Sequence, residues 1–286
     1  MDSQNRDANP IIKLRTLYNS LRASEQKVAD YINVHPEEII YLSISALADK
    51  CGVSEASVIR LCKVLGYEGY QALKISMARS LIAPVKYIHE EIEEGDDLDK
   101  ITQKVMVADM KAIEDTLKIL DRAEVGRAID AMSNARKIEF YGLGGSAPVA
   151  FDAQHKFLRH GIPCIAYNDS HMQIMSASML GKGDVVVGIS HSGSTIDIVD
   201  SLKIASKSGA ETICITSSEN SPITKVASIK LIISARELTY RPEPMASRIA
   251  QLAVIDVLSV GVALKREGQV VSNIEKSREA LIKKRY

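Results

Sequence analysis

Residues 137–147 read KIEFYGLGGSA, and residues 184–195 read DVVVGISHSGST. Each stretch is a short apolar run that ends in glycine and serine residues, which predicts a buried strand followed by a turn. The strands are expected at Lys137–Tyr141 and Asp184–Ile189. Runs of the same kind predict further strands at Ile162–Tyr167, Glu211–Thr216 and Ile229–Ile233.

Helical stretches separate these predicted strands. They cover Pro148–His160, Met172–Leu180, Thr195–Ser208 and Ile223–Ala227, and a last apolar helix is expected over Ala246–Lys265. Alternation of near-continuous apolar strands with helices is typical of a parallel sheet that helices cover on both faces. We therefore predict a doubly wound α/β domain with a five-stranded, flavodoxin-like sheet of order 2-1-3-4-5, whose core spans about residues 135–265.

The first part of the chain has a different pattern. From Ile11 to about Ser80 the apolar residues recur at helical spacing, which predicts a small all-helical domain. Ser24 and Ser54 precede such runs and suit helix N-cap positions. A composition shift, with an acidic run, indicates a linker over residues 83–100 between domains at 1–82 and 101–286. Helices are expected over Leu98–Leu120 and Arg122–Asn134 at the start of the second domain.

Residues 44–63, ISALADKCGVSEASVIRLCK, fit a helix-turn-helix. Two helices that meet at a steep angle need a small residue at the contact, a glycine with positive φ in the turn, and apolar residues on the second helix. Ala48, Gly52, Val58 and Leu61 supply these features. The second helix then exposes the side chains that would meet a DNA major groove. The predicted DNA-binding residues are Ser54, Glu55, Ala56, Ser57, Arg60 and Lys63.

Charge supports DNA binding only locally. The whole chain has 36 Lys and Arg residues against 36 Asp and Glu residues, which excludes a uniformly basic protein. Residues 50–79, in contrast, have an excess of basic residues, namely Lys50, Arg60, Lys63, Lys74 and Arg79 against Glu55 and Glu68. Because this excess is small, one copy should bind DNA weakly, and a dimer is expected. The alternative is a helical hairpin that contacts other proteins.

Composition excludes several other classes. The chain is 46% hydrophobic and 25% charged, which is ordinary for a globular protein. The apolar run Ile249–Ala263 is interrupted by Gln251 and Asp256, and it is too short to predict a membrane span. The N-terminus has no apolar signal core. The cysteines, at 51, 62, 164 and 214, lack metal-binding spacing, so we expect buried thiols, no metal and a cytoplasmic protein.

The two glycine- and serine-rich turns predict a ligand site. In a sheet of order 2-1-3-4-5, strands 1 and 3 meet where the chain reverses direction, and ligands bind at their carboxyl ends. Glycines allow close approach of the backbone, and helix N-termini with hydroxyl groups favour a phosphate. The predicted ligand residues are Gly144, Gly145, Ser146, Ser190, His191, Ser192, Gly193 and Thr195, with His191 acting through its backbone rather than in catalysis. Since neither loop contains Lys or Arg, the cradle suits a sugar phosphate.

Two enzyme alternatives remain open. Gly142-x-Gly144-x-x-Ala147, with Asp169 beyond the second strand, fits a dinucleotide fingerprint, although this leaves the loop SHSGST unexplained. An aldose–ketose phosphate isomerase would need a base near the site. Glu237, Glu243 and His191 are the candidates for that base. We expect no catalytic residues and no cofactor.

The chain resembles the RpiR-type transcriptional regulators, which join a helix-turn-helix domain to a sugar isomerase (SIS) domain. The resemblance rests on ISALADKCGVSEASVIRLCKVLGYEGYQALK, YGLGGSA, GISHSGSTID and PMASRIAQLAVIDVL. It implies a cytoplasmic bacterial regulator of sugar catabolism that binds a DNA operator as a homodimer or homotetramer, with a phosphosugar as effector. It also implies that Ser146, Ser190, Ser192 and Thr195 hold the phosphate. Glu243 would accept sugar hydroxyls or fix the loop at 241–247.

Overall fold

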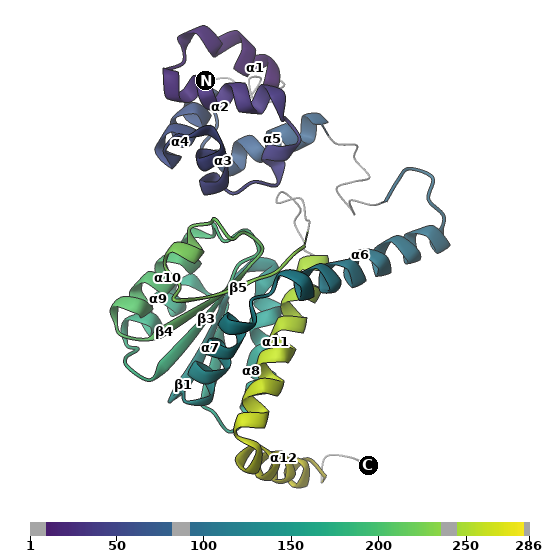
Figure 1. Cartoon of the computed structure of the whole chain (residues 1–286), viewed down its shortest axis with the longest axis vertical. Helices are drawn as coiled ribbons and strands as arrows, with labels where there is room; N and C mark the ends of the chain where they lie inside the picture. The colour runs from purple at the N-terminus through teal and green to yellow at the C-terminus, as the bar shows by residue number, and fades with distance from the viewer. Residues whose placement is uncertain (1–9, 82–91, 236–244, 283–286) are drawn as a thin grey trace. The chain divides into compact units, whose positions relative to one another are not determined.

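The computed structural model describes residues 10–81, 92–235 and 245–282 (Figure 1). The chain divides into two compact units, the first comprising the described residues up to Ala108 and the second those from Asp109. The division falls inside α6 (Leu98–Ile119), a continuous helix. The domain boundaries at 82 and 101 stay predictions, and the first half of the predicted linker, residues 83–91, lies outside the described residues.

The first unit is helical in its described part, as predicted. Its α-helices are α1 (Pro10–Leu17), α2 (Ala23–Val34), α3 (Ile44–Cys51), α4 (Glu55–Val64) and α5 (Tyr70–Leu81), with 3₁₀ turns at Tyr18–Ser20 and Glu38–Ile40. One hydrophobic cluster joins these helices, and Val28, Ile32, Leu47, Val58 and Leu61 are fully buried in it. The apolar residues at helical spacing therefore form the core of this unit.

The second unit contains the predicted parallel sheet. Its strands are β1 (Lys137–Gly142), β2 (Cys164–Tyr167), β3 (Asp184–Ile189), β4 (Glu211–Thr216) and β5 (Ile229–Ile232), and their spatial order is β2-β1-β3-β4-β5. All neighbouring pairs are parallel. Every residue of β3, the central strand, is buried, because helices cover both faces of the sheet. The predicted fold class and strand order are confirmed.

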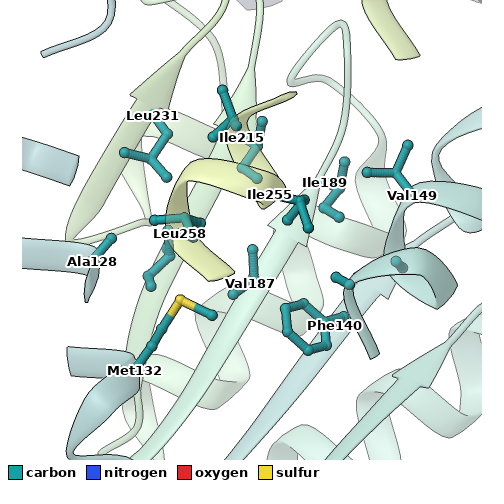
Figure 2. Close-up of a cluster of buried hydrophobic side chains, with 14 of the residues drawn as sticks. Ala128, Met132, Phe140, Val149, Val187, Ile189, Ile215, Leu231, Ile255 and Leu258 are labelled. Atoms are coloured by element: carbon teal, nitrogen blue, oxygen red, sulfur yellow. The ribbon is translucent and has the colours of Figure 1, made fainter. Parts of the chain in front are cut away.

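Two helical layers enclose the sheet (Figure 1). The helices α7 (Arg122–Ser133), α8 (Ala147–Leu158) and α11 (Ala246–Lys265) pack on one face, and α9 (Ser170–Ser178) and α10 (Ile196–Lys207) pack on the other. Figure 2 shows the first of these layers, where Ile255 and Leu258 of α11 meet Val187 and Ile189 of β3. Each face thus has its own apolar core.

Several element boundaries differ from the prediction for local reasons. β2 starts at Cys164 rather than Ile162, since Pro163 has no N–H to donate to the sheet. The N-cap of α2 is Arg22, so Ser24 lies inside that helix and the predicted cap there is wrong. The stretch Ile223–Ala227 forms only a 3₁₀ turn at Ile223–Lys225. An additional helix, α12 (Glu267–Ile282), was not predicted, because Val270 is its only buried residue.

The helix α11 has the predicted bounds, Ala246–Lys265, and extends beyond the apolar run Ile249–Ala263 at both ends. Within the described residues it is the one helix long and apolar enough, by length and composition, to cross a membrane. In the structure its buried face, with Val254, Ile255 and Leu258, packs on the sheet together with α7 and α8. A core helix of this kind passes the same test of length and composition as a membrane span.

Candidate functional site

The helix-turn-helix is formed by α3, Gly52 and α4. Gly52 ends α3 with φ 62°, a conformation that side chains with a Cβ disfavour, and its N–H donates to carbonyl oxygens of the last turn. The Val53 N–H donates to the Ala48 oxygen at 2.9 Å, which fixes the turn. Ala48 is 2% exposed, and Val58 and Leu61 are fully buried. All the features that predicted this motif are therefore present.

The face of α4 that sequence analysis assigned to DNA is only partly exposed. Ser54, Ala56, Arg60 and Lys63 are exposed, and Glu55 is half-buried. The Oε1 atom of Glu55 accepts a hydrogen bond from the Ser45 hydroxyl at 2.5 Å, so this carboxylate ties α4 to α3. The exposed members of the set can contact a partner directly, whereas Glu55 also has a role inside the motif.

Ser57 is buried, and the expectation that it would be exposed is wrong. Only 3% of this residue is exposed, since it lies one turn before Leu61 on the face that packs inward. Its hydroxyl contacts the Ser54 hydroxyl at 3.1 Å and accepts a hydrogen bond from Arg60 at 2.8 Å. Ser54 does occupy the N-cap position of α4, but its side chain makes no capping hydrogen bond.

Arg60 is held at the surface by groups of its own unit. Besides the bond to Ser57, its Nε atom lies 3.7 Å from Oε1 of Glu25 in α2. Only 4% of the Glu25 side chain is exposed, against 45% of the Arg60 side chain. The buried carboxylate thus orients a guanidinium that still faces solvent. An Arg in a fixed orientation is well suited to bidentate contacts with a guanine or a phosphate.

The basic excess counted in residues 50–79 is smaller at the surface than in the sequence. Lys74 is 3% exposed and donates to the Leu42 carbonyl at 2.8 Å, so it contributes nothing to an exposed charged face. Burial lowers the pKa of Lys74 to about 7. Lys50 pairs with Glu38 at 3.6 Å. The expected contribution of Lys74 to a basic DNA-facing surface is therefore wrong.

In the second unit, the two glycine- and serine-rich loops start side by side. In the parallel register of β1 and β3, Gly142 is paired with Ile189, so both strands end at the same level. The loop at 143–146 follows β1, and the loop at 190–195 follows β3. β1 and β3 are the strands between which the order of the sheet reverses, and this is where doubly wound sheets bind ligands.

The first loop folds tightly back over the end of β1. A Cβ atom on Gly142 would lie 2.5 Å from the backbone oxygen of Ser146, so this position requires glycine. A 3₁₀ turn at Gly144–Ser146 leads directly into α8. Ser146 is 8% exposed, Gly145 is half-buried, and Gly144 is exposed. The loop therefore brings its serine to the N-terminus of a helix.

In the second loop the hydroxyl groups pair with one another. The Ser190 and Thr195 hydroxyls lie 3.0 Å apart, although five positions separate them in the chain. Ser192 accepts a hydrogen bond from the Ser194 N–H at 3.3 Å. Thr195 is the N-cap residue of α10, yet its side chain makes no capping bond. The hydroxyls of Ser190 and Thr195 thus gather at the start of a helix, where anions are stabilised.

The loop after β4 supports the second loop, and sequence analysis missed it. The carbonyl oxygen of His191 accepts hydrogen bonds from the Ser217 N–H at 3.0 Å, the Ser217 hydroxyl at 2.8 Å and the Thr216 hydroxyl at 3.0 Å. The Ile223 N–H donates to the carbonyl oxygen of Gly193 at 2.9 Å. The signal was available in the serine-rich run TSSENS at 216–221, directly after a predicted strand. His191 therefore has a backbone role in holding the loop.

The structure assigns other roles to the remaining candidates that it describes. Glu237 and Glu243 lie outside the described residues. Asp169, considered for a dinucleotide, caps α9 by accepting from the Met172 N–H. Cys62 and Cys214 are buried free thiols, and burial raises the pKa of each to about 12. Among the described residues, no group of three or more His, Cys, Asp or Glu side chains could hold a metal ion.

Comparisons with known proteins agree with this architecture. The helix-turn-helix domain of the rpiR family matches residues 9–84, and the SIS domain matches residues 131–261. An uncharacterized HTH-type transcriptional regulator, TTE0211 of Caldanaerobacter subterraneus, is 43% identical over 94% of this chain and 95% of its own length. The HTH-type transcriptional regulator HexR of Escherichia coli is 35% identical over 97% and 96% of the two chains.

Other relatives are longer or known in three dimensions. The bifunctional protein glk of Paraburkholderia xenovorans is 40% identical over 93% of this chain, which spans only 42% of its length. The structure of the Vibrio vulnificus NanR protein complexed with ManNAc-6P matches with a TM-score of 0.86 and 25% identity, covering 97% of this chain and 99% of that one. With both domains matched in order and close full-length relatives, this chain belongs to the RpiR family of helix-turn-helix transcriptional regulators that carry a SIS domain.

Proposed function

We propose that this RpiR-family regulator binds a DNA operator through α4 and changes its operator affinity when a sugar phosphate binds at the loops after β1 and β3. The observation that carries the proposal is the register of Gly142 with Ile189, which starts both hydroxyl-bearing loops at one edge of the sheet. Because DNA and sugar phosphates are both cytoplasmic, we propose that the protein acts in the cytoplasm.

For the DNA site, we propose that exposed Arg60 and Lys63 carry most of the contacts, with Ser54 and Ala56 beside them. The fixed guanidinium of Arg60 supports a role in reading bases, whereas Lys63 suits a phosphate. Glu55 and Ser57 belong to the same predicted set. Since Ser57 is 3% exposed and bonds to Arg60, its proposed role is to position that side chain.

For the effector site, we propose that Ser190, Ser192 and Thr195 hold the phosphate, with Ser146 facing them from the first loop. The mutual hydrogen bond between Ser190 and Thr195, at 3.0 Å, supports this role, since both hydroxyls can turn to a ligand at the start of α10. Gly144, Gly145, His191 and Gly193 would contribute backbone groups. Glu243 is proposed as a contact to sugar hydroxyls or as an anchor of its loop.

We also propose that the DNA-binding form is a homodimer or a larger homo-oligomer. A single copy exposes few basic side chains on α4, so high affinity requires two half-sites. In α6, Met106, Met110, Ile113 and Leu117 are between 42% and 60% exposed and recur at intervals of four and three residues. Exposed apolar residues at this spacing are typical of helices that pack against another helix.

The test is fluorescence anisotropy of the full chain on DNA from upstream of its own gene, with and without a panel of sugar phosphates. One panel member should shift operator affinity by a coupling free energy of ~1–3 kcal/mol. The double variant Ser190→Ala, Ser192→Ala should keep DNA binding and lose this shift. Light scattering at micromolar concentration should show at least a dimer. Absence of binding to any fragment at low salt would contradict the proposal and direct the same panel to an isomerase assay.

A further inference from the structure

The buried face of α11 carries a polar side chain that packing alone does not explain. Gln251 is 1% exposed, while its neighbours on this face, Ala250, Val254, Ile255 and Leu258, are apolar and buried. Gln251 precedes Leu258 by two turns and Ile255 by about one turn, so all three lie on one stripe of the helix. Since Ile255 and Leu258 pack on the sheet, Gln251 faces it too.

The position of Gln251 along the sheet follows from the direction of α11. In Figure 2, the direction from Leu258 back to Ile255 is about the same as the direction from Val187 forward to Ile189. Because the first of these runs against the chain and the second runs with it, α11 is antiparallel to β3. A residue one turn before Ile255 in α11 therefore lies about 5.4 Å closer to the carboxyl end of the strand than Ile255 does. Ile189 is the last residue of β3. Gln251 thus lies at the level where the loops after β1 and β3 begin.

One atom of the Gln251 side chain, its amide nitrogen, lacks a hydrogen-bond partner in the part of the chain that the structure describes. This Nε2 atom is buried. By contrast, the Nε2 atom of Gln173, a fully buried glutamine on the other face, donates to the Tyr167 carbonyl at 2.8 Å. An unpaired buried donor is destabilising, and the large majority of buried side-chain polar atoms have a hydrogen-bond partner. The fold thus supplies an acceptor for Gln173 and leaves the Gln251 donor for another oxygen.

We propose that Gln251 is a sugar-recognition residue, whose amide donates a hydrogen bond to a hydroxyl or carbonyl oxygen of the bound sugar phosphate. This assignment rests on the effector site proposed above. The proposed phosphate ligands lead into α10, on one face of the sheet, whereas α11 covers the opposite face. A ligand whose phosphate lies at the start of α10 and whose sugar extends across the sheet edge would bring its oxygens toward Gln251.

The experiment compares wild-type protein with Gln251→Leu, which keeps the approximate volume and removes the donor. Isothermal titration of the full chain would use glucose 6-phosphate, ribose 5-phosphate, N-acetylmannosamine 6-phosphate and inorganic phosphate. For the sugar phosphate that binds wild-type protein most tightly, Gln251→Leu should bind at least tenfold more weakly. Competition by inorganic phosphate should be unchanged, because the phosphate ligands are intact.

The controls separate recognition from packing. Ser201, in the middle of α10, has a buried hydroxyl that also lacks a hydrogen-bond partner among the described residues. The variant Ser201→Ala removes this hydroxyl and should bind the sugar phosphate like wild type. If Gln251→Leu fails to fold, the nearly isosteric variant Gln251→Glu replaces it in the titration. This variant should also bind the sugar phosphate at least tenfold more weakly than wild type. If either folded variant binds the sugar phosphate as tightly as wild type, the role of Gln251 is overturned, while the proposed effector site stands. Wild-type protein that binds none of the sugar phosphates overturns the proposed effector site and this assignment together.

Discussion

Gly52 in the helix-turn-helix and Gly193 in the loop after β3 have nearly the same positive φ, 62° and 63°. Their surroundings differ completely. A Cβ atom on Gly52 would meet nothing within 4 Å, whereas one on Gly193 would lie 2.2 Å from the Ser221 hydroxyl oxygen and 2.8 Å from that of Thr216. The first turn is thus determined by its own residues, and the second also by a loop far away in the chain.

This difference predicts unequal costs for the same substitution. Gly193→Ala combines an unfavourable positive φ with overpacking, so it should destabilise the second unit by about 2–5 kcal/mol and abolish the effector response. Gly52→Ala has only the backbone cost, about 1–2 kcal/mol in the first unit. Hydrogen exchange of the full chain, read separately for β3–β4 and for α3–α4, would measure both. Equal losses in the two units would contradict the comparison.

The fold was predictable to the extent that it depends on local pattern. The runs Asp184–Ile189 and Glu211–Thr216 are dense in β-branched residues, and both strands have the predicted bounds. The predicted positive φ at Gly52 was also correct. The burial of Ser57 could have been predicted, because it precedes Leu61 by one helical turn. The helix-turn-helix motif alone predicts an exposed start of α4, whereas the helical spacing places Ser57 on the inner face.

The site was less predictable, because its contacts join distant segments. The serine- and glycine-rich stretches identified the two loops, but not the hydroxyl pair of Ser190 and Thr195 or the three donors on the His191 oxygen. Those donors come from the end of β4, more than twenty positions later in the chain. Similarly, the amide nitrogen of Gln251, which has no hydrogen-bond partner among the described residues, becomes evident only when α11 is placed on the sheet.

Arg60 differs from the hydroxyls of the loop after β3, which hydrogen-bond to one another, because a buried carboxylate orients its guanidinium. Arg60→Ala should weaken specific operator binding by ~1–3 kcal/mol, because a base contact is lost. Lys63→Ala, the matched control, should weaken binding to all sequences about equally and reduce its salt dependence. Anisotropy titrations on operator and scrambled DNA at several salt concentrations would measure both. Operator affinity unchanged by Arg60→Ala would remove Arg60 from base recognition.

Two buried ionisable side chains, one in each unit, are held in different ways. In the second unit, buried Glu139 accepts hydrogen bonds from Tyr141 at 2.5 Å, Ser176 at 2.7 Å and Lys137 at 3.0 Å. In the first unit, buried Lys74 donates to a neutral acceptor, the Leu42 carbonyl just before α3, and burial lowers its pKa to about 7. A group of this kind makes the stability of the helix-turn-helix unit depend on pH.

The sign of this dependence follows from the two states. An unfolded lysine has a pKa of about 10.4, so above pH 7 the unfolded state binds more protons than the folded state, and stability rises with pH. The free energy of unfolding should rise by about 1 kcal/mol per pH unit from pH 7 to about 8.5. Above pH 8.5, cysteines lose protons in the unfolded state, whereas buried Cys62, with a pKa of about 12, keeps its proton in the folded state. This difference opposes the rise in stability that Lys74 causes. In Lys74→Met the rise should disappear. Urea unfolding at pH 7.0, 7.5, 8.0 and 8.5, followed by circular dichroism, would measure the difference between the two proteins, in which the cysteine contribution cancels. If the two pH profiles are parallel, Lys74 keeps an ordinary pKa in the folded protein, and its burial imposes no charge-dependent cost on the motif.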